Sequence, residues 1–325
     1  MHPAFSVIFL TTLIGIGQGL FLAMFTVESH VAFALLPKQS HAFYAYGSLL
    51  ALVFLVAGLV ASFWHLGRPE RAWRAATRWR TSWLSREVIV LPAFMGATFI
   101  YGVAHMFSFS PVVGALPGGV PVTLTDLVGA AGTILAFALF VSTGMIYACV
   151  RFLREWSSPL TVINYTLLGW ASGFTVATLY AGYVAPHLVP FMAGWALILT
   201  VLGFISRVAS LIRNARLKPK STLQSALGIK HPKIVQKTQG AMGGSFNTRE
   251  FFHGAKPALL RSVKWFFLVA AFVIPIVLLS TGISGRTTTI LLAAALIQYV
   301  GLLAERWFFF AQANHPQNLY YQSVA

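Results

Sequence analysis

The sequence predicts an all-α integral membrane protein, folded as a bundle of eight transmembrane helices, and three observations support this class. The chain of 325 residues is 57% hydrophobic and only 9% charged, whereas soluble domains carry about 25% charged residues. Apolar stretches of about 20 residues, the length that crosses a bilayer as a helix, recur from one end to the other. The alternating pattern of a membrane β-barrel is absent, so helix is the conformation that satisfies the backbone inside lipid.

We interpret residues 1–325 as a single membrane domain with one long polar connection. The predicted spans cover residues 4–27, 43–64, 88–108, 125–150, 160–185, 189–212, 263–281 and 287–306. Residues 214–262 are too polar to span a membrane and too long for a simple turn. We therefore predict a loop that is either disordered or bound to a partner protein.

Basic side chains fall on one side of the predicted bundle. Of the 23 Lys and Arg residues, all but Lys38, Arg207 and Arg286 lie in the connections after spans two, four and six or at the C-terminal end. The positive-inside rule places these connections, the loop 214–262 and both termini in the cytoplasm, and the chain in a bacterial inner membrane. This bias explains the net charge of +16, so we expect membrane lipids and no nucleic acid as partners.

The sequence shows no pattern of metal ligands. Cys149 is the one cysteine, so cysteine ligands cannot build a zinc or iron–sulfur site, and we predict that it is a small buried core residue. A b-type haem needs two axial ligands at similar depth, but His65 lies at one end of the spans and His105 and His187 lie at the other. We expect neither a metal nor a haem in this chain.

The connection between spans two and three holds the candidate site. His65 ends span two, and its ordinary pKa lets it exchange protons near neutral pH. A quinone gains or loses two protons together with two electrons, so a His hydrogen-bonded to a quinone carbonyl suits that chemistry. Glu87 opens span three and could relay the proton to water, because ionisable groups at membrane depth are costly and are functional candidates by default.

Neighbouring side chains complete the candidate binding site for the ring. Arg68 could orient the ring or pair with Glu87, and Trp64 and Trp83 could form its apolar walls. The alternative is that Trp and Arg at span ends are ordinary interfacial anchors, that His65 caps a helix end and that Glu87 neutralises an Arg.

Further polar residues carry weaker signals. Gln18 lies within span one and is expected to hydrogen-bond a neighbouring helix rather than a ligand. The pair Glu305-Arg306 ends span eight on the basic side, where it either borders the same site or forms a neighbouring pair. Asp126 is expected to cap span four. The remaining candidates lie on the opposite side and are interpreted as interfacial residues: Glu28, His30, Lys38, His41, His105 and His187.

The residues of this connection carry a resemblance to a known family. The matching residues are His65-Leu66-Gly67-Arg68-Pro69, Arg71-Ala72, Ser82, Leu84-Ser85 and Glu87, with Glu305-Arg306-Trp307-Phe308-Phe309-Phe310 near the C-terminus. Together with the eight spans, they resemble the membrane-anchor subunits of the dimethyl sulfoxide reductase and polysulfide reductase group. The resemblance covers essentially the whole chain.

The resemblance implies a function and a set of partners. It implies a quinone (ubiquinone or menaquinone) bound by the anchor, a ferredoxin-like iron–sulfur subunit with four clusters and a catalytic subunit with a molybdopterin cofactor. It implies quinol binding and proton transfer at His65 and Glu87. The chain would then be a subunit of a quinone-linked oxidoreductase without the substrate-oxidising site itself.

Two features resemble a particular subgroup of this family, the anchors of cytoplasm-facing, quinone-linked sulfite dehydrogenases. They are the cytoplasmic orientation of the basic connections and the inserted loop with its string Ser245-Phe246-Asn247-Thr248-Arg249-Glu250. Electrons would then run from sulfite to quinone. The alternatives are a sulfoxide-type reductase that runs from quinol to substrate, an anchor with a purely structural role, and a secondary transporter, which would require ionisable groups near the midplane.

Overall fold

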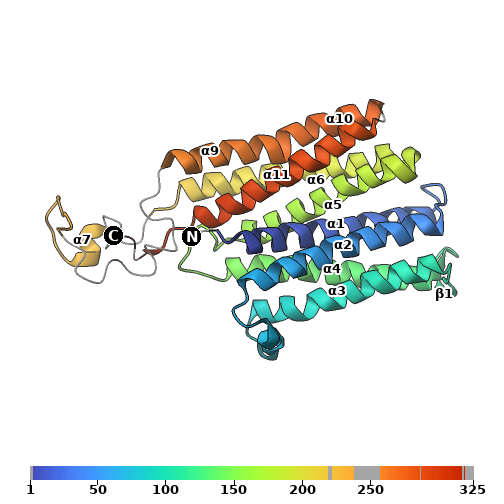
Figure 1. Cartoon of the computed structure of the whole chain (residues 1–325), viewed down its shortest axis with the longest axis horizontal. Helices are drawn as coiled ribbons and strands as arrows, with labels where there is room; N and C mark the ends of the chain where they lie inside the picture. Colours follow the sequence, from blue (N-terminus) through green and yellow to red (C-terminus); the bar gives the residue numbers. More distant parts are fainter. Residues whose placement is uncertain (1–2, 219–221, 238–256, 286, 317, 319–325) are drawn as a thin grey trace.

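The computed structural model describes residues 3–218, 222–237, 257–285, 287–316 and 318. Figure 1 shows long helices that run side by side along the long axis of the molecule. These are α1 (Phe5–Ala32), α2 (His41–Ser62), α3 (Trp83–Met106), α4 (Leu124–Ala148), α5 (Pro159–Val184), α6 (Val189–Ala215), α9 (Pro257–Leu268), α10 (Ile274–Gly285) and α11 (Thr288–Ala311). Each predicted span corresponds to a helix, and the seventh corresponds to α9 and α10 joined by the π-helical turn η4 (Val269–Val273).

Seven segments among the described residues are long and apolar enough to cross a membrane, so the predicted count of eight is met only if α5 spans as well. α5 has 26 residues and no charged side chain, but it carries polar residues such as Asn164, Thr175 and Thr178, which are buried. It packs against α1, α4, α6 and α11. Its surroundings are therefore mostly protein, so its buried polar side chains meet other helices rather than lipid.

Glycines allow α1 and α5 to cross in close contact at the centre of the bundle. A Cβ atom on Gly173 would lie 2.2 Å from the carbonyl carbon of Gly19, and one on Gly19 would lie 2.5 Å from the carbonyl oxygen of Gly169. Both helices repeat glycine at a spacing of four residues, since Gly15 precedes Gly19 and Gly169 precedes Gly173. Small residues at this spacing let helix backbones approach one another inside a membrane.

A second close approach places α11. Pro275 has no N–H group to bond the carbonyl of Ala271, and the helix widens into η4 at this point. The widened turn lies against Gly301, where a Cβ atom would come within 2.2 Å of the amide nitrogen of Ala271. This contact fixes the part of α11 that leads directly to Glu305 and Arg306.

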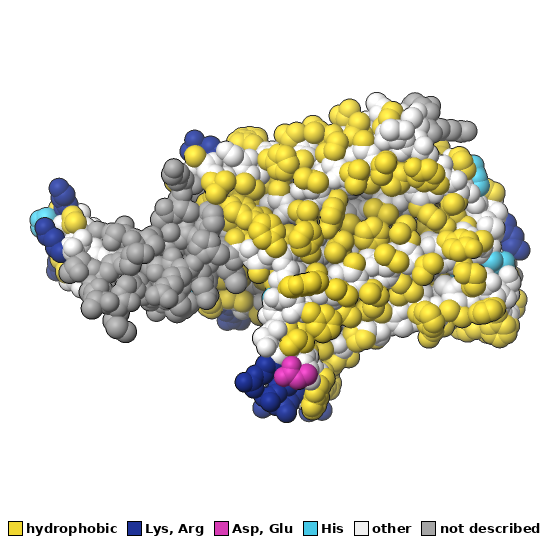
Figure 2. Space-filling model, viewed as in Figure 1, with side chains coloured by type: hydrophobic (Ala, Val, Ile, Leu, Met, Phe, Trp, Pro, Cys, Tyr) yellow, Lys and Arg dark blue, Asp and Glu magenta, His cyan; other side chains and the backbone are white. Residues whose placement is uncertain are grey.

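The two ends of the bundle differ in charge. The basic end, as we call it, comprises η1 (Phe63–His65), η2 (Pro69–Arg78), the connection 149–158 and residues 213–218. α1 begins and α11 ends there (Figure 1). Figure 2 shows Lys and Arg gathered at this end, while hydrophobic side chains cover the flank. The hairpin end, opposite, carries the antiparallel strands β1 (Val112–Ala115) and β2 (Pro121–Thr123).

One sequence prediction is wrong here, and others fall partly or wholly outside the described residues. Cys149 is exposed rather than buried, because it caps the C-terminus of α4 beyond the last packed turn. Of the polar loop 214–262, the structure describes only parts, including the short exposed helix α7 (Leu223–Leu227). The string Ser245-Phe246-Asn247-Thr248-Arg249-Glu250 and Arg286 lie outside the described residues.

Candidate functional site

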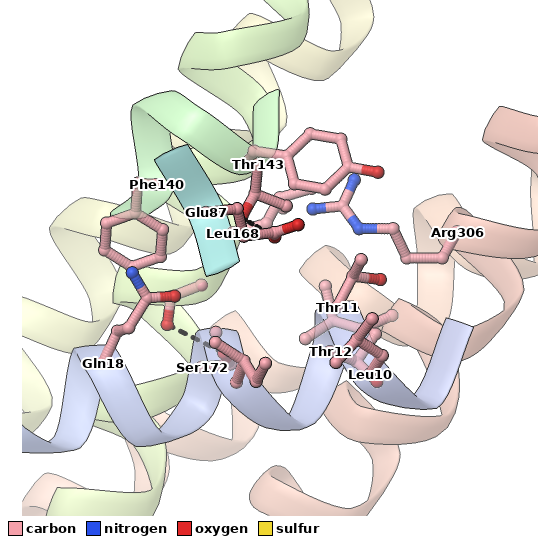
Figure 3. Close-up of a pocket in the computed structure, with 15 residues that line it drawn as sticks. Leu10, Thr11, Thr12, Gln18, Glu87, Phe140, Thr143, Leu168, Ser172 and Arg306 are labelled. Atoms are coloured by element: carbon pink, nitrogen blue, oxygen red, sulfur yellow. Dashed lines mark hydrogen bonds between the residues drawn. The ribbon is translucent and has the colours of Figure 1, made fainter. Parts of the chain in front are cut away.

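A small cavity lies where α1, α3, α4, α5 and α11 meet (Figure 3). Its polar lining comes from Gln18, Glu87, Thr143, Tyr165 and Arg306 together with the hydroxyl groups of Thr11, Thr12 and Ser172, and apolar residues complete it. The space open to the centre of a water molecule is about 20 Å³, which is room for about one water. A larger ligand therefore requires lining side chains to move.

Glu87 points into this cavity. It lies just inside α3, whose N-terminus is capped by Ser82, which accepts a hydrogen bond from the backbone N–H of Ser85 at 3.3 Å. The hydroxyl of Thr143 on α4 donates a short hydrogen bond to Oε1 of Glu87. Figure 3 shows the two side chains pointing toward one another, with Arg306 reaching toward them from α11. The partner of Glu87 is thus Thr143, and not Arg68 as one prediction had it.

Arg306 belongs to a buried row of charges. Its Nη1 lies 3.1 Å from Oε2 of Glu305, and Oε1 of Glu305 lies 2.7 Å from Nε of Arg207. The guanidinium carbon of Arg306 lies 3.7 Å from the centre of the Tyr165 ring. Glu305, Arg207 and Arg306 are 0%, 1% and 4% exposed. Charges so far from water are stable only when paired with good geometry, and this row links α6 to the cavity.

Gln18 both bonds a neighbouring helix and lines the cavity. Its Nε2 donates to the carbonyl oxygen of Ala136 at 2.8 Å, which ties α1 to α4 as the sequence suggested. The same side chain lines the cavity beside Phe140.

The other predicted residues lie outside the cavity. Trp64 is 78% exposed, and His65 and Arg68 are exposed as well. η1, which contains Trp64 and His65, lies beside α1 at the basic end. Trp83 starts α3 and holds the guanidinium of Arg86 at 4.0 Å from its ring. The structure therefore brings together three of the seven candidates, namely Gln18, Glu87 and Arg306.

Sequence reasoning missed several residues that border or support the cavity. Thr143 and Tyr165 were missed because Thr and Tyr in apolar helices carry no distinctive pattern. Arg207 was visible as a charge inside a span, but its partner Glu305 lies far along the chain. Only the packing of α6 against the C-terminal helices reveals that pair.

A second polar cluster lies at the hairpin end, where Glu28 and His105 were expected to be interfacial. Both are largely buried, and Nε2 of His105 lies 3.2 Å from Oε1 of Glu28. Tyr101 and Thr125 donate hydrogen bonds to the same carboxylate at 2.6 and 2.7 Å. The interfacial interpretation was wrong for these two residues because α1, α3 and α4 converge on them.

This cluster reaches the surface through a histidine pair. Nδ1 of His105 lies 3.3 Å from Nδ1 of the exposed His41. Phe21 and Phe94, both fully buried and packed edge to face at 5.3 Å, lie between the cluster and the cavity. Among the described residues, no group of three or more His, Cys, Asp or Glu is arranged to hold a metal ion.

The fold and the cavity define a class: a polytopic helical membrane protein with buried ionisable side chains between its helices. Comparison with known proteins identifies the family. The chain belongs to the DMSO reductase anchor subunit (DmsC) family, which it matches over residues 1–311. It is 57% identical to a sulfite dehydrogenase subunit of Allochromatium vinosum over 325 residues, which cover the whole of both chains. The resemblance inferred from the His65–Glu87 connection is confirmed.

Proposed function

We propose that this chain anchors a molybdoenzyme in the membrane and passes electrons between an iron–sulfur partner and the quinone pool. The observation that carries the proposal is the cavity in which Glu87, Thr143 and Arg306 converge. The name of the Allochromatium relative favours sulfite as the substrate of the catalytic partner. In that direction the anchor delivers electrons to quinone, and the site that oxidises sulfite lies in another subunit.

The lining of the cavity fits a quinone ring in chemistry. A bound quinone takes up two protons with two electrons, and it offers two carbonyl oxygens as acceptors. Arg306 is a donor, Glu87 can hold and release a proton, and Phe140 offers an aromatic face. Since the cavity has room for only about one water, we propose that the ring enters as lining side chains move aside.

Proton exchange with water is proposed for the basic end. His65 is exposed there, with Trp64 and Arg68 beside it in the chain and Trp83 at the start of α3. An imidazole in contact with water can pass protons at neutral pH. In this proposal Glu87 serves the ring and His65 serves the solvent.

A shallow apolar groove offers a place for the isoprenoid tail. It measures about 460 Å³ and is lined by Phe5 of α1, by Val263 and Phe266 of α9, and by Leu303 and Trp307 of α11. Two of these helices, α1 and α11, also line the cavity. We assign the tail of the quinone to this groove because it is apolar and lies on helices that the ring site shares.

Partner docking is proposed for the basic end, which would face the cytoplasm of a bacterial inner membrane. η2 presents Arg71, Arg74 and Arg78 to the surface, and we assign the loop 214–262 to the same docking surface. Charge complementarity at such a surface would guide and orient an iron–sulfur subunit.

The test uses the intact complex in membranes. Glu87→Ala and His65→Ala should each cut sulfite-dependent quinone reduction by about tenfold or more, the scale of general acid–base catalysis. Sulfite oxidation with an artificial dye should stay unchanged, because it bypasses the anchor. Glu70→Ala, which removes an exposed carboxylate from η2, is the matched control. Unchanged quinone turnover in Glu87→Ala would remove the proposed site.

The family assignment also favours a second direction. A DMSO reductase anchor would take electrons from quinol and deliver them toward a sulfoxide. The same preparation distinguishes the two, because sulfite-dependent quinone reduction supports the first proposal and quinol-dependent sulfoxide reduction supports the second.

A further inference from the structure

The row formed by Arg207, Glu305 and Arg306 carries an unbalanced charge. Glu305 faces Arg207 with one carboxylate oxygen, at 2.7 Å, and Arg306 with the other, at 3.1 Å. Two guanidinium groups thus share one carboxylate, and the row has one positive charge in excess. All three side chains are almost fully buried, so water compensates little of this excess.

The excess charge faces the cavity rather than the far side of the row. Arg207 lies away from the cavity, with its guanidinium carbon 5.4 Å from the centre of the Phe267 ring and 5.8 Å from that of Phe308. It also donates to the hydroxyl of Ser210 at 3.4 Å. Of the three charged residues, only Arg306 lines the cavity. A negative charge that could balance the row must therefore lie in the cavity or in its wall.

Glu87 is the one carboxylate among the described residues that form that wall. When Glu87 is ionised, the four groups sum to zero; when it holds a proton, one positive charge remains. A ligand with an acidic ring hydroxyl keeps the total charge at zero in either case, because it supplies the negative charge when Glu87 holds the proton. Its O–H bond breaks, the proton forms an O–H bond on the Glu87 carboxylate, and the electron pair stays on the ring oxygen. The total charge is unchanged, and the negative charge moves onto the ligand beside Arg306.

We propose that the Arg207–Glu305–Arg306 row makes this cavity select ring ligands in their deprotonated, anionic form over neutral rings of the same shape. The inference rests on the proposed function, since it concerns the ring that would bind there. Arg306 is the residue that contacts the ligand. Arg207 is a positioning residue: by occupying one oxygen of Glu305, it prevents that carboxylate from neutralising Arg306 completely.

The alternative is that the row only clamps α6 to α11. A clamp would support folding of the site for every ligand equally. Selection by charge would change the affinity for an anion while leaving the affinity for a neutral analogue in place. The two explanations therefore predict different results with a matched pair of ligands.

The experiment measures binding of two probes to the purified intact complex by quenching of tryptophan fluorescence. The probes are 2-hydroxy-1,4-naphthoquinone, which is anionic at neutral pH, and its neutral 2-methoxy ether. We expect the wild type to bind the hydroxy compound about tenfold more tightly than the ether, and Arg306→Gln to bring the ratio near one. Arg207→Gln should lower the ratio with ether affinity retained. Glu87→Gln should raise it, because a competing negative charge is removed.

Controls separate this inference from general charge attraction and from misfolding. Lys38→Gln removes an exposed positive charge at the hairpin end and should leave the ratio unchanged. Arg306→Lys keeps the positive charge and should keep the preference for the hydroxy compound. If the complex with Arg306→Gln does not assemble, the affinity ratios of Arg306→Lys and Glu87→Gln test the selection instead. Equal binding of both probes, unaffected by Glu87→Gln, would overturn the selection while leaving quinone binding intact. Failure of both probes to bind would instead count against the proposed function.

Discussion

Replacing Gly173 with Ala tests the crossing of α1 and α5, on which the cavity depends. The added Cβ atom would lie 2.2 Å from the carbonyl carbon of Gly19, whereas ordinary contacts begin at 3.4 Å. The obstacle is backbone, which cannot rotate away as a side chain can. The two helices must therefore separate locally by about 1 Å, and dispersion contacts along the crossing weaken over that distance.

The magnitude follows from the type of contact. Forcing extra volume into a packed core costs about 1–3 kcal/mol and occasionally more. Gly194→Ala in α6 is the matched control, because nothing lies within 4 Å of its added Cβ and Gly→Ala in a helix stabilises by about 0.5–1 kcal/mol. We expect the free energies of unfolding of the two variants to differ by about 1–3 kcal/mol, because the gain from Gly→Ala in a helix is common to both.

The assay is thermal unfolding of the purified protein in detergent, followed by near-ultraviolet circular dichroism. Gly173→Ala should unfold at a clearly lower temperature than wild type, and Gly194→Ala at the same temperature or higher. Gly173→Ala should also weaken quinone-analogue binding, since Gly15 and Gly169 of the same crossing line the cavity. Equal midpoints for the two variants would refute the close crossing.

Two further perturbations test the ends of the bundle. Glu28→Ala leaves Tyr101, Thr125 and His105 without their shared partner. It should cost about 1–3 kcal/mol, as leaving a buried donor without its acceptor does, and a midpoint within about 1 °C of wild type would show that the cluster contributes little. Burial raises the pKa of the Glu155 carboxyl in the connection 149–158. A carboxyl with a raised folded-state pKa adds stability below its unfolded-state pKa, and this stability is lost as the pH rises through the folded-state pKa. Glu155→Gln should therefore raise the unfolding temperature at pH 8 and leave it unchanged at pH 4, and equal effects at both pH values would contradict the raised pKa.

Most of the fold was predictable because hydropathy and length determine where helices cross a membrane. The predicted spans match the helices to within a few residues at most ends, as for 125–150 against Leu124–Ala148. The turn η4 was not predictable as such, because a proline in an apolar helix can produce a kink, a π-turn or a break. The hairpin β1–β2 is short and depends on the positive φ angles of Gly118 and Gly119.

The site was predictable in part, for reasons that differ from residue to residue. Glu87 stood out because a carboxylate at the start of a span is costly unless it has a role. His65 and Arg68 lie close to Glu87 in sequence, but α3 turns Glu87 inward while η1 and η2 stay at the surface. The sequence left open whether Arg306 borders the site, because its place beside Tyr165 depends on how α11 rotates against α5.

The polar character of α5 bears on how the protein is made. Helices α1–α4 leave the ribosome before α5. Among the long helices that the structure describes, α5 is the one that lies outside the seven segments apolar enough to span by length and composition. A segment that partitions weakly into lipid needs polar and small faces to be met by protein. Because α1 is synthesised first, its surface with Gly15 and Gly19 is already in the bilayer when α5 arrives, and α5 can pack against it. Errors in the first helix would then appear as failed insertion of the fifth.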